Sequence, residues 1–107
     1  MPRVDAAFKN RVYDIVAQIP KGKVMTYSQI AGIAGAAWAA WEVGQIAHTG
    51  SERLPWQRVV NKKGGLAAGY PGGRAGHKSD LESEGVEVLG SEPDWFVEVE
   101  KLIWVPK

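Results

Sequence analysis

Apolar residues recur at helical spacing through the first twenty residues of the chain. One stripe at 100° per residue consists of Phe8, Val12, Ile15, Val16 and Ile19. Asp5 stands before this stripe and can cap the free amides of a first helical turn, whereas Pro20 and Gly22 interrupt the pattern. The pattern therefore predicts a helix that is capped by Asp5 and runs to about Gln18.

A second helix is predicted from Thr26, because Thr26 and Gln29 have the spacing of a capping box. The Thr26 hydroxyl can accept from the Gln29 amide while the Gln29 side chain reaches back. This short helix extends to about Ala34, Gly35 makes a turn, and a third helix is predicted over residues 36–47. The order is the outline of a helix-turn-helix, although many helical hairpins share it.

The two faces of the third predicted helix differ in character. Its small apolar face comprises Ala36, Ala39, Ala40, Val43, Ile46 and Ala47. The opposite face comprises Trp38, Trp41, Gln45 and His48. The two indoles either pack beneath the C-terminal tail or form a nucleic-acid surface, where indoles stack on bases or wedge between them. The pattern alone leaves both interpretations open.

The C-terminal half combines short apolar segments with glycine-rich loops. Val59 and Val60 predict a short strand that leads into a turn, as in a small hairpin or wing. Six glycines from residue 64 to residue 76 surround Tyr70 and Pro71, and no GxxxxGK(S/T) pattern marks a phosphate-binding loop. Three side chains nearby either contact phosphates or form ordinary surface: Arg74, His77 and Lys78.

The pattern of the remaining residues predicts a fourth helix, followed by a tail for which it allows either a strand or a helix. The helix spans about residues 76–84 and is ended by Gly85. Apolar and acidic residues alternate over residues 96–100, as in a strand, whereas residues 91–94 can instead begin a helix. Two residues are expected to pack the terminus against the rest of the domain: Trp104 and Pro106.

Composition limits the class of protein. The 107 residues, 45% of them apolar, fit one domain over residues 1–107. The absence of cysteine excludes a disulfide framework, a thiolate nucleophile and a cysteine-ligated metal. No apolar run approaches the roughly 20 residues of a membrane span, and the N-terminus lacks the apolar stretch of a signal peptide. We therefore expect a cytoplasmic or nucleoid-associated protein with no membrane association. A monomer is the oligomeric state that we expect.

The charge is distributed unevenly along the chain. Residues 1–78 hold eleven Lys and Arg against four acids, a net +7, whereas residues 79–107 hold two against eight, a net −6. A basic body with an acidic tail is compatible with a polyanion partner on one face, although solvated surface gives the same pattern.

No catalytic or metal-binding set is evident. His48 and His77 lie in no metal-binding pattern, and Ser28 and Ser51 lie in no nucleophile elbow. Glu84 is interpreted as a solvated glutamate at a helix end. The residues themselves therefore disfavour a hydrolase or a transferase and indicate neither a metal nor a cofactor.

Residues 55–60, Pro-Trp-Gln-Arg-Val-Val, resemble the Pro-Cys-His-Arg-Val active-site motif of O6-alkylguanine-DNA alkyltransferases. Trp56 stands where that family has its alkyl-accepting cysteine, which makes the chain similar to the non-catalytic alkyltransferase-like proteins. Further matches are Ile19–Val24 with Thr26-Tyr27, Val43-Gly44, Tyr70–Gly73, Glu84–Val86 and the ending Lys101–Pro106. The resemblance implies a mainly α fold with a small β part, a winged helix-turn-helix-like domain of the alkyltransferase C-terminal type.

The resemblance also implies a function. The domain would bind double-stranded DNA through the minor groove and rotate an O6-alkylguanine into a pocket without alkyl transfer, and the complex would recruit nucleotide excision repair proteins. Tyr27 would push on the phosphate, Trp56 would supply an apolar pocket wall, and Arg58 would hold the motif loop. The implied pocket residues are Tyr27, Trp56, Val60, Gly69, Tyr70 and Pro71. The implied DNA-binding residues are Tyr27, Ser28, Gln29, Trp38, Trp41, Gln45 and Arg74.

Three departures from the family pattern bear on this function. The family's arginine finger aligns with Trp41, which could intercalate as a flat apolar wedge but carries no charge. The catalytic histidine aligns with Gln57, so no histidine–glutamate relay with Glu84 can form. An arginine with which some members sense the lesion aligns with Gly69, which leaves only Arg74 nearby.

Three functions remain in view. The leading hypothesis is a non-enzymatic sensor of O6-alkylguanine, located on the nucleoid when it is bound to DNA. The second is a helix-turn-helix DNA-binding or architectural domain without lesion specificity. The third is residual glycosylase or lyase activity, against which the lack of a poised acid–base pair argues.

Overall fold

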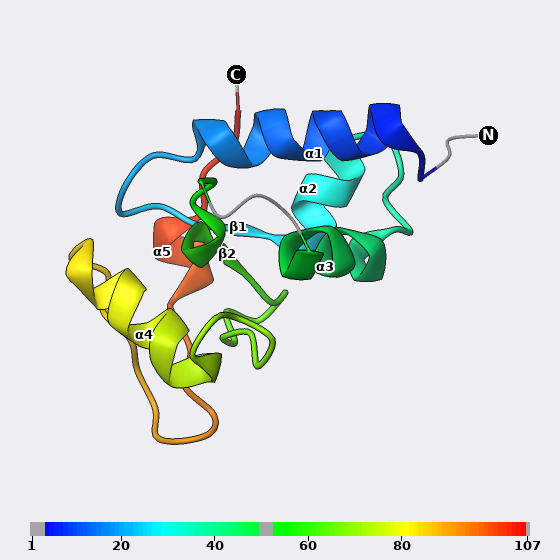
Figure 1. Cartoon of the computed structure of the whole chain (residues 1–107). Helices are drawn as coiled ribbons and strands as arrows, with labels where there is room; N and C mark the ends of the chain where they lie inside the picture. The colour runs from blue at the N-terminus through cyan, green and yellow to red at the C-terminus, as the bar shows by residue number, and fades with distance from the viewer. Residues whose placement is uncertain (1–3, 50–52, 107) are drawn as a thin grey trace.

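A three-helix unit and a loop-rich half meet at a small central sheet (Figure 1). The computed structural model describes residues 4–49 and 53–106. Within these ranges the elements are α1 (Ala6–Gln18), β1 (Met25–Thr26), α2 (Tyr27–Ile33), α3 (Ala40–Thr49), η1 (Trp56–Arg58), β2 (Val59–Val60), α4 (Gly73–Ser83) and α5 (Val99–Leu102).

Helix α1 confirms the prediction from its apolar stripe. Asp5 caps it, since a carboxylate oxygen of Asp5 accepts from the Phe8 amide at 3.0 Å. The stripe faces α2 and α3, and Phe8, Val12 and Val16 are fully buried. Burial of each such side chain contributes about 1.5–3 kcal/mol, so this face holds α1 to the other two helices.

Helix α2 begins with the predicted capping box. The Gln29 amide donates to the Thr26 hydroxyl at 3.1 Å, and the Thr26 amide donates to the Gln29 side chain at 3.3 Å. Gly35 ends the helix in a left-handed conformation with φ 102°. The helix-turn-helix outline is present, with α2 and α3 packed against each other.

Helix α3 begins at Ala40, so the prediction of a helix from Ala36 was wrong by one turn. The Ala36 amide donates back to Ala31 at 2.9 Å, and the Ala39 amide donates to Ala36 at 2.8 Å. Both methyl groups are buried, which fixes residues 36–39 as a separate turn against the core despite the helical propensity of alanine. Trp38 consequently lies in this turn, ahead of the helix.

The central sheet joins the two halves of the chain. Strands β1 and β2 are parallel, with Met25 opposite Val59 and Thr26 opposite Val60. Successive strand residues face opposite ways, so Val59 packs in the cluster of α1–α3 whereas Val60 packs in a second cluster of the C-terminal half. The strand predicted at Val59 and Val60 is confirmed.

Helix α4 begins at Gly73, three residues before the predicted start. Gly72 and Gly73 both have positive φ and turn the chain into the helix, so these glycines belong to a helix start as well as to a loop. A Cβ at Gly76 would lie 2.3 Å from the Pro71 carbonyl oxygen, so glycine there lets the loop lie on the helix. Gly85, with φ 83°, follows the C-cap as predicted.

The tail combines parts of both alternatives. Residues 91–94 form a turn rather than a helix, and Phe96 pairs with Gly65 and with Leu89 in isolated bridges. Helix α5 follows over residues 99–102. The Trp104 amide donates to Val24, and the Gln29 side chain donates to the Trp104 carbonyl at 2.6 Å, so the terminus is held against the body. In the described ranges, no helix is long and apolar enough to cross a bilayer.

Candidate functional site

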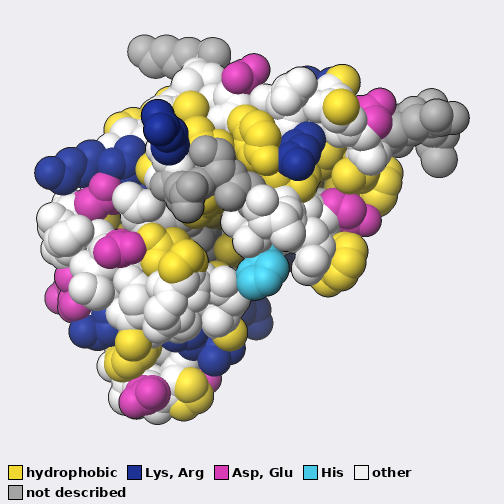
Figure 2. Space-filling view, viewed as in Figure 1, with side chains coloured by type: hydrophobic (Ala, Val, Ile, Leu, Met, Phe, Trp, Pro, Cys, Tyr) yellow, Lys and Arg dark blue, Asp and Glu magenta, His cyan; other side chains and the backbone are white. Residues whose placement is uncertain are grey.

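A cleft of about 1260 Å³ lies between the helix-turn-helix and the C-terminal half. The space-filling view from the side of Figure 1 shows apolar side chains in the hollow between the two halves (Figure 2). The helical wall is lined by Tyr27, Ser28, Trp41, Gln45 and His48. The base and the opposite wall are lined by Trp56, Gln57, Lys62, Ala67, Gly69, Tyr70, Pro71, Arg74 and Asp80.

Trp56 is both a core residue and a wall of the cleft. It is the first residue of the 3₁₀ turn η1, which follows Pro55, and only 8% of its surface is exposed. Its indole packs edge-on against Tyr13, with ring centroids 6.3 Å apart. This packing against α1 fixes the indole, so the cleft has a rigid apolar wall at the centre of the sequence motif.

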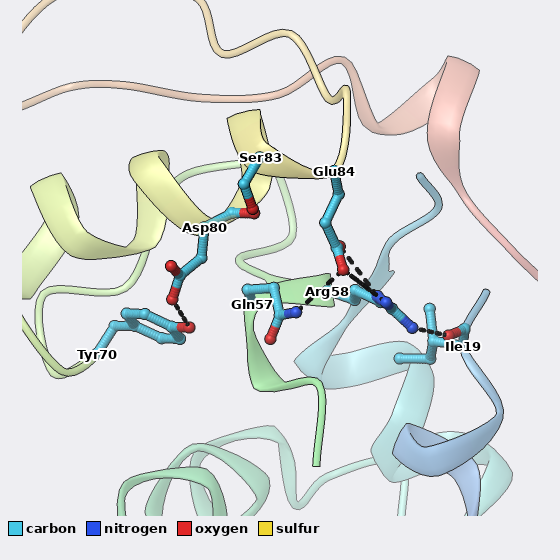
Figure 3. Close-up of polar contacts among 7 residues, drawn as sticks. All are labelled: Ile19, Gln57, Arg58, Tyr70, Asp80, Ser83 and Glu84. Carbon is cyan, nitrogen blue, oxygen red and sulfur yellow. Dashed lines mark hydrogen bonds and ion pairs between the residues drawn. The ribbon is translucent and has the colours of Figure 1, made fainter. Parts of the chain in front are cut away.

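Arg58 ties the motif turn to two other segments. Its guanidinium pairs with Glu84 at 2.5 Å and donates to the Ile19 carbonyl at 2.7 Å (Figure 3). The interpretation of Glu84 as a solvated helix end was wrong, because its side chain is only 10% exposed and also accepts from the Gln57 amide at 3.2 Å. The hydrogen bond from Arg58 holds the pKa of Glu84 below its usual value. This carboxylate is committed to binding its neighbours and is a poor proton acceptor.

His77 is fully buried behind the cleft, so the alternative in which it contacts phosphates was wrong. The Ala67 amide donates to its Nδ1 at 3.0 Å, which leaves the proton of the neutral ring on Nε2, 2.9 Å from the Gln57 carbonyl. Burial lowers the pKa of His77 and favours this neutral form. A signal was available in the sequence: with the helix begun at Gly73, His77 and Leu81 share one buried face.

Tyr70 stacks on His77 and is fixed by its hydroxyl. The ring centroids are 4.6 Å apart, and the phenol donates to the Asp80 carboxylate (Figure 3). Burial, followed by the bond to Asp80, raises the pKa of Tyr70, so the phenol stays protonated at neutral pH. Asp80 and Lys62 line the cleft, and the sequence motifs had identified neither.

The helical wall presents exposed aromatic side chains. Trp41 is 71% exposed and lines the cleft, whereas Trp38 is 60% exposed and is absent from its lining. The interpretation that the two indoles pack under the C-terminal tail was therefore wrong. His48 reaches across the cleft, with its Nδ1 3.3 Å from the Gly69 carbonyl oxygen.

The structure brings most of the expected pocket residues together. Tyr27, Trp56, Gly69, Tyr70 and Pro71 line the cleft. Besides Tyr27, four more of the expected DNA-binding residues line it: Ser28, Trp41, Gln45 and Arg74. Burial raises the pKa of Tyr27, so its phenol too remains protonated at neutral pH.

Three expected site residues do not line the cleft: Trp38, which lies on the outer surface, Val60 and Gln29. Val60 does not line the cleft, because its side chain is fully buried in the second core cluster. Gln29 does not line it either, since its side chain is held by the capping box and by Trp104. Among the described residues, no three acidic or histidine side chains are placed to hold a metal ion.

Comparisons with known proteins bear on this cleft. Residues 7–86 match the family described as 6-O-methylguanine DNA methyltransferase, DNA binding domain. The chain is 36% identical over 103 residues to Alkyltransferase-like protein 1 of Schizosaccharomyces pombe, covering 92% of this chain and 95% of that protein. It is 41% identical over 87 residues to the DNA base-flipping protein of Escherichia coli, covering 79% of this chain and 67% of that protein.

Comparison with solved structures also relates the chain to an alkyltransferase-like protein. The structure superposes with a TM-score of 0.86 on the crystal structure of S. pombe Atl1 in complex with damaged DNA containing O6-carboxymethylguanine. The match covers 98% of this chain and 100% of that chain at 34% identity. The predicted fold class, mainly α with a small β part in a helix-turn-helix domain of the alkyltransferase type, is confirmed.

Proposed function

Because the chain belongs to the 6-O-methylguanine DNA methyltransferase DNA-binding domain family, as an alkyltransferase-like member, we propose that it is a non-enzymatic sensor of alkylated DNA. It binds the minor groove and holds an O6-alkylguanine, rotated out of the duplex, in the cleft. The observation that carries this proposal is the rigid indole of Trp56 in the wall of an open cleft beside a helix-turn-helix.

The cleft has the shape and chemistry to hold a rotated base. Its volume of about 1260 Å³ exceeds the roughly 300–1,000 Å³ of ordinary small-molecule pockets, which leaves space for a nucleotide and its backbone. Tyr27, Trp56 and Tyr70 offer aromatic surface to a base, as enzymes that extrude bases do. Arg74 and Lys62 supply positive charge at the same cleft for the phosphates.

The chemistry of the cleft argues for retention of the alkyl group. The sequence contains no cysteine, and an indole N–H is only a donor, so Trp56 offers no nucleophile. Gln57 carries an amide in place of a base, and Glu84 is occupied by Arg58. A bound lesion would therefore stay unchanged.

Trp41 is the proposed wedge in the duplex. Its indole is the most exposed large apolar side chain on α3, and it lies on the cleft side of that helix. Side chains that proteins insert between base steps from the minor groove are commonly apolar wedges, which unstack the step and kink the duplex. Ser28, Gln45 and Arg74 would contact the backbone around it.

A sensor that does not repair the lesion needs a second system. Removal of the intact alkylated nucleotide requires proteins that cut the strand, and we propose that the bound complex recruits nucleotide excision repair. The bent DNA and the occupied cleft would then be the signal, since a wedge and a rotated base kink the duplex.

A second candidate is a helix-turn-helix DNA-binding domain without lesion specificity. It is favoured by one observation: the sequence has Trp41 and Gly69 at the two positions where the family pattern has arginine. Neither position therefore supplies a charged group for recognition of damaged DNA. This candidate predicts the same salt-dependent duplex binding but no preference for damaged sites.

Titration of matched duplexes, with and without one O6-methylguanine, separates the two candidates. The sensor predicts tighter binding to the damaged duplex at the same salt concentration, with the methyl group and both strands intact afterwards. Equal affinities would favour the second candidate. Strand cleavage or loss of the methyl group would show an enzyme.

A further inference from the structure

One buried histidine connects the base of the cleft to the wall opposite the helices, from behind. His77 lies on α4, has no exposed surface and is not part of the cleft lining. Its ring contacts Gln57 on η1, next to Trp56, and Ala67 and Tyr70 on the facing loop. All three of these partners do line the cleft.

The two ring nitrogens have fixed and different roles. A backbone N–H can only donate, so the Nδ1 of His77 accepts from the Ala67 N–H at 3.0 Å. The protonated Nε2 then donates to the Gln57 carbonyl oxygen at 2.9 Å. The ring face packs on Tyr70 at a centroid distance of 4.6 Å and an interplanar angle of 19°. The ring is therefore a rigid spacer between the Tyr70 loop and the Trp56 turn.

We propose that His77 is a positioning residue that fixes the spacing between the Trp56 turn and the Tyr70 loop, and thereby the preference of the cleft for a rotated alkylated base. The proposal rests on the proposed function, since it assigns selectivity to the same cleft. A histidine suits this role because a neutral imidazole accepts on one edge, donates on the other and offers an aromatic face between them. A histidine that served only to fill the core would affect stability without affecting selectivity.

Two substitutions each keep one half of the connection. The oxygen of His77→Asn can accept from Ala67 near the place of Nδ1 but cannot reach Gln57. The amide of His77→Gln can donate to Gln57 near the place of Nε2 but leaves Ala67 without its acceptor. Val86→Ala is the matched control, because Val86 is 3% exposed in the second core cluster and does not line the cleft.

The readout is the ratio of the dissociation constant for the undamaged duplex to that for the O6-methylguanine duplex, measured with each full-length variant. The protein concentration is corrected to the folded fraction, which circular dichroism measures. Loss of one hydrogen bond that shapes the cleft should lower this ratio about fivefold or more in both His77 variants. Affinity for the undamaged duplex, which depends on the phosphates, should change little. Val86→Ala should lower the melting temperature and leave the ratio unchanged.

The result separates the two proposals. No preference for the damaged duplex in the wild-type protein would overturn the sensor function itself. A wild-type preference that persists in folded His77→Asn and His77→Gln would overturn only the role of His77.

Amide hydrogen exchange tests the positioning independently of DNA. The Ala67 amide should exchange faster in His77→Gln than in the wild type, whereas amides in the middle of α1 should not change. An unchanged rate at Ala67 would contradict the proposal whatever the DNA affinities are.

Discussion

The two walls of the cleft are held in place by different forces. The helical wall, formed by α2 and α3, rests on an apolar core with α1, in which Phe8, Ile30 and Val43 are fully buried. In the opposite wall, residues 66–71, Leu66 joins the second apolar cluster, and the loop beyond it is tied to α4 by the polar side chains of His77 and Asp80. Apolar packing is non-directional, whereas hydrogen bonds demand short distances and defined angles.

This difference separates stability from selectivity. Loss of packing in the helical half should affect the whole fold, because that half contains the larger cluster of buried residues. Loss of a polar contact behind the loop should mainly move one wall of the cleft. The predictions below test that separation.

Phe8→Ala should give the largest loss of stability. Phe8 has no exposed surface and packs α1 onto the core, so its truncation should lower the free energy of unfolding by about 3–5 kcal/mol. Equilibrium denaturation in urea measures this. Val105→Ala is the control, because Val105 is 66% exposed and its truncation should change stability by less than about 0.5 kcal/mol. A small effect of Phe8→Ala would contradict the assignment of stability to the helical half.

Arg58→Met should destabilise the protein less than Phe8→Ala does but more than the loss of a surface ion pair does. It removes the bonds to Glu84 and to the Ile19 carbonyl, which should lower the free energy of unfolding by about 1–3 kcal/mol. Lys78→Met breaks the exposed pair with Glu82 and should cost less than about 0.5 kcal/mol. Denaturant titration of both variants measures the difference, and equal losses would show that the Arg58 pair is ordinary surface.

Trp41→Ala should weaken lesion binding with little change in stability. The side chain is 71% exposed, and loss of one stacked aromatic should reduce affinity for the damaged duplex by about tenfold. Trp104→Ala is the comparison, because Trp104 packs against the core of the helical half and should affect the melting temperature more than the affinity. Titration of both variants with the damaged duplex checks this, and equal affinities would count against Trp41 as the wedge.

Acid should destabilise the protein in two separate ranges of pH. The folded-state pKa of His77 lies below its ordinary value of 6.5, so the unfolded chain takes up that proton first and stability falls as the pH drops below about 6.5. The folded-state pKa of Glu84 lies below 4.5, so its contribution is complete above that pH and is lost as the pH falls through the folded-state value. Thermal melts from pH 7.5 to pH 3.5 should show both losses, and His77→Asn should remove the first. If the loss of stability below about pH 6.5 persists in His77→Asn, another titrating group is its cause.

Local sequence patterns predicted the helical half well. The stripe of α1, the capping box of α2 and the turn at Gly35 depend on residues close together in the chain, so periodicity and capping rules apply to them. The family motif also located the cleft, because Trp56, Tyr70 and Pro71 all line it.

The loop-rich half was harder to predict because its order depends on distant partners. Arg58 binds Ile19 and Glu84, and His77 joins Gln57 to Ala67, none of which a local pattern reveals. The glycines before α4 also hid the start of that helix, and Val60 was assigned to the pocket although its side chain faces the second core cluster.

The central claim is preferential binding of the lesion without transfer of its alkyl group. The most direct test is a competition experiment, in which a complex with a methyl-labelled O6-methylguanine duplex is challenged with excess undamaged duplex and then with unlabelled damaged duplex. The account predicts that only the damaged competitor displaces the labelled DNA efficiently and that the released DNA retains all of its label. Equal displacement by the undamaged duplex, or label left on the protein, would contradict it.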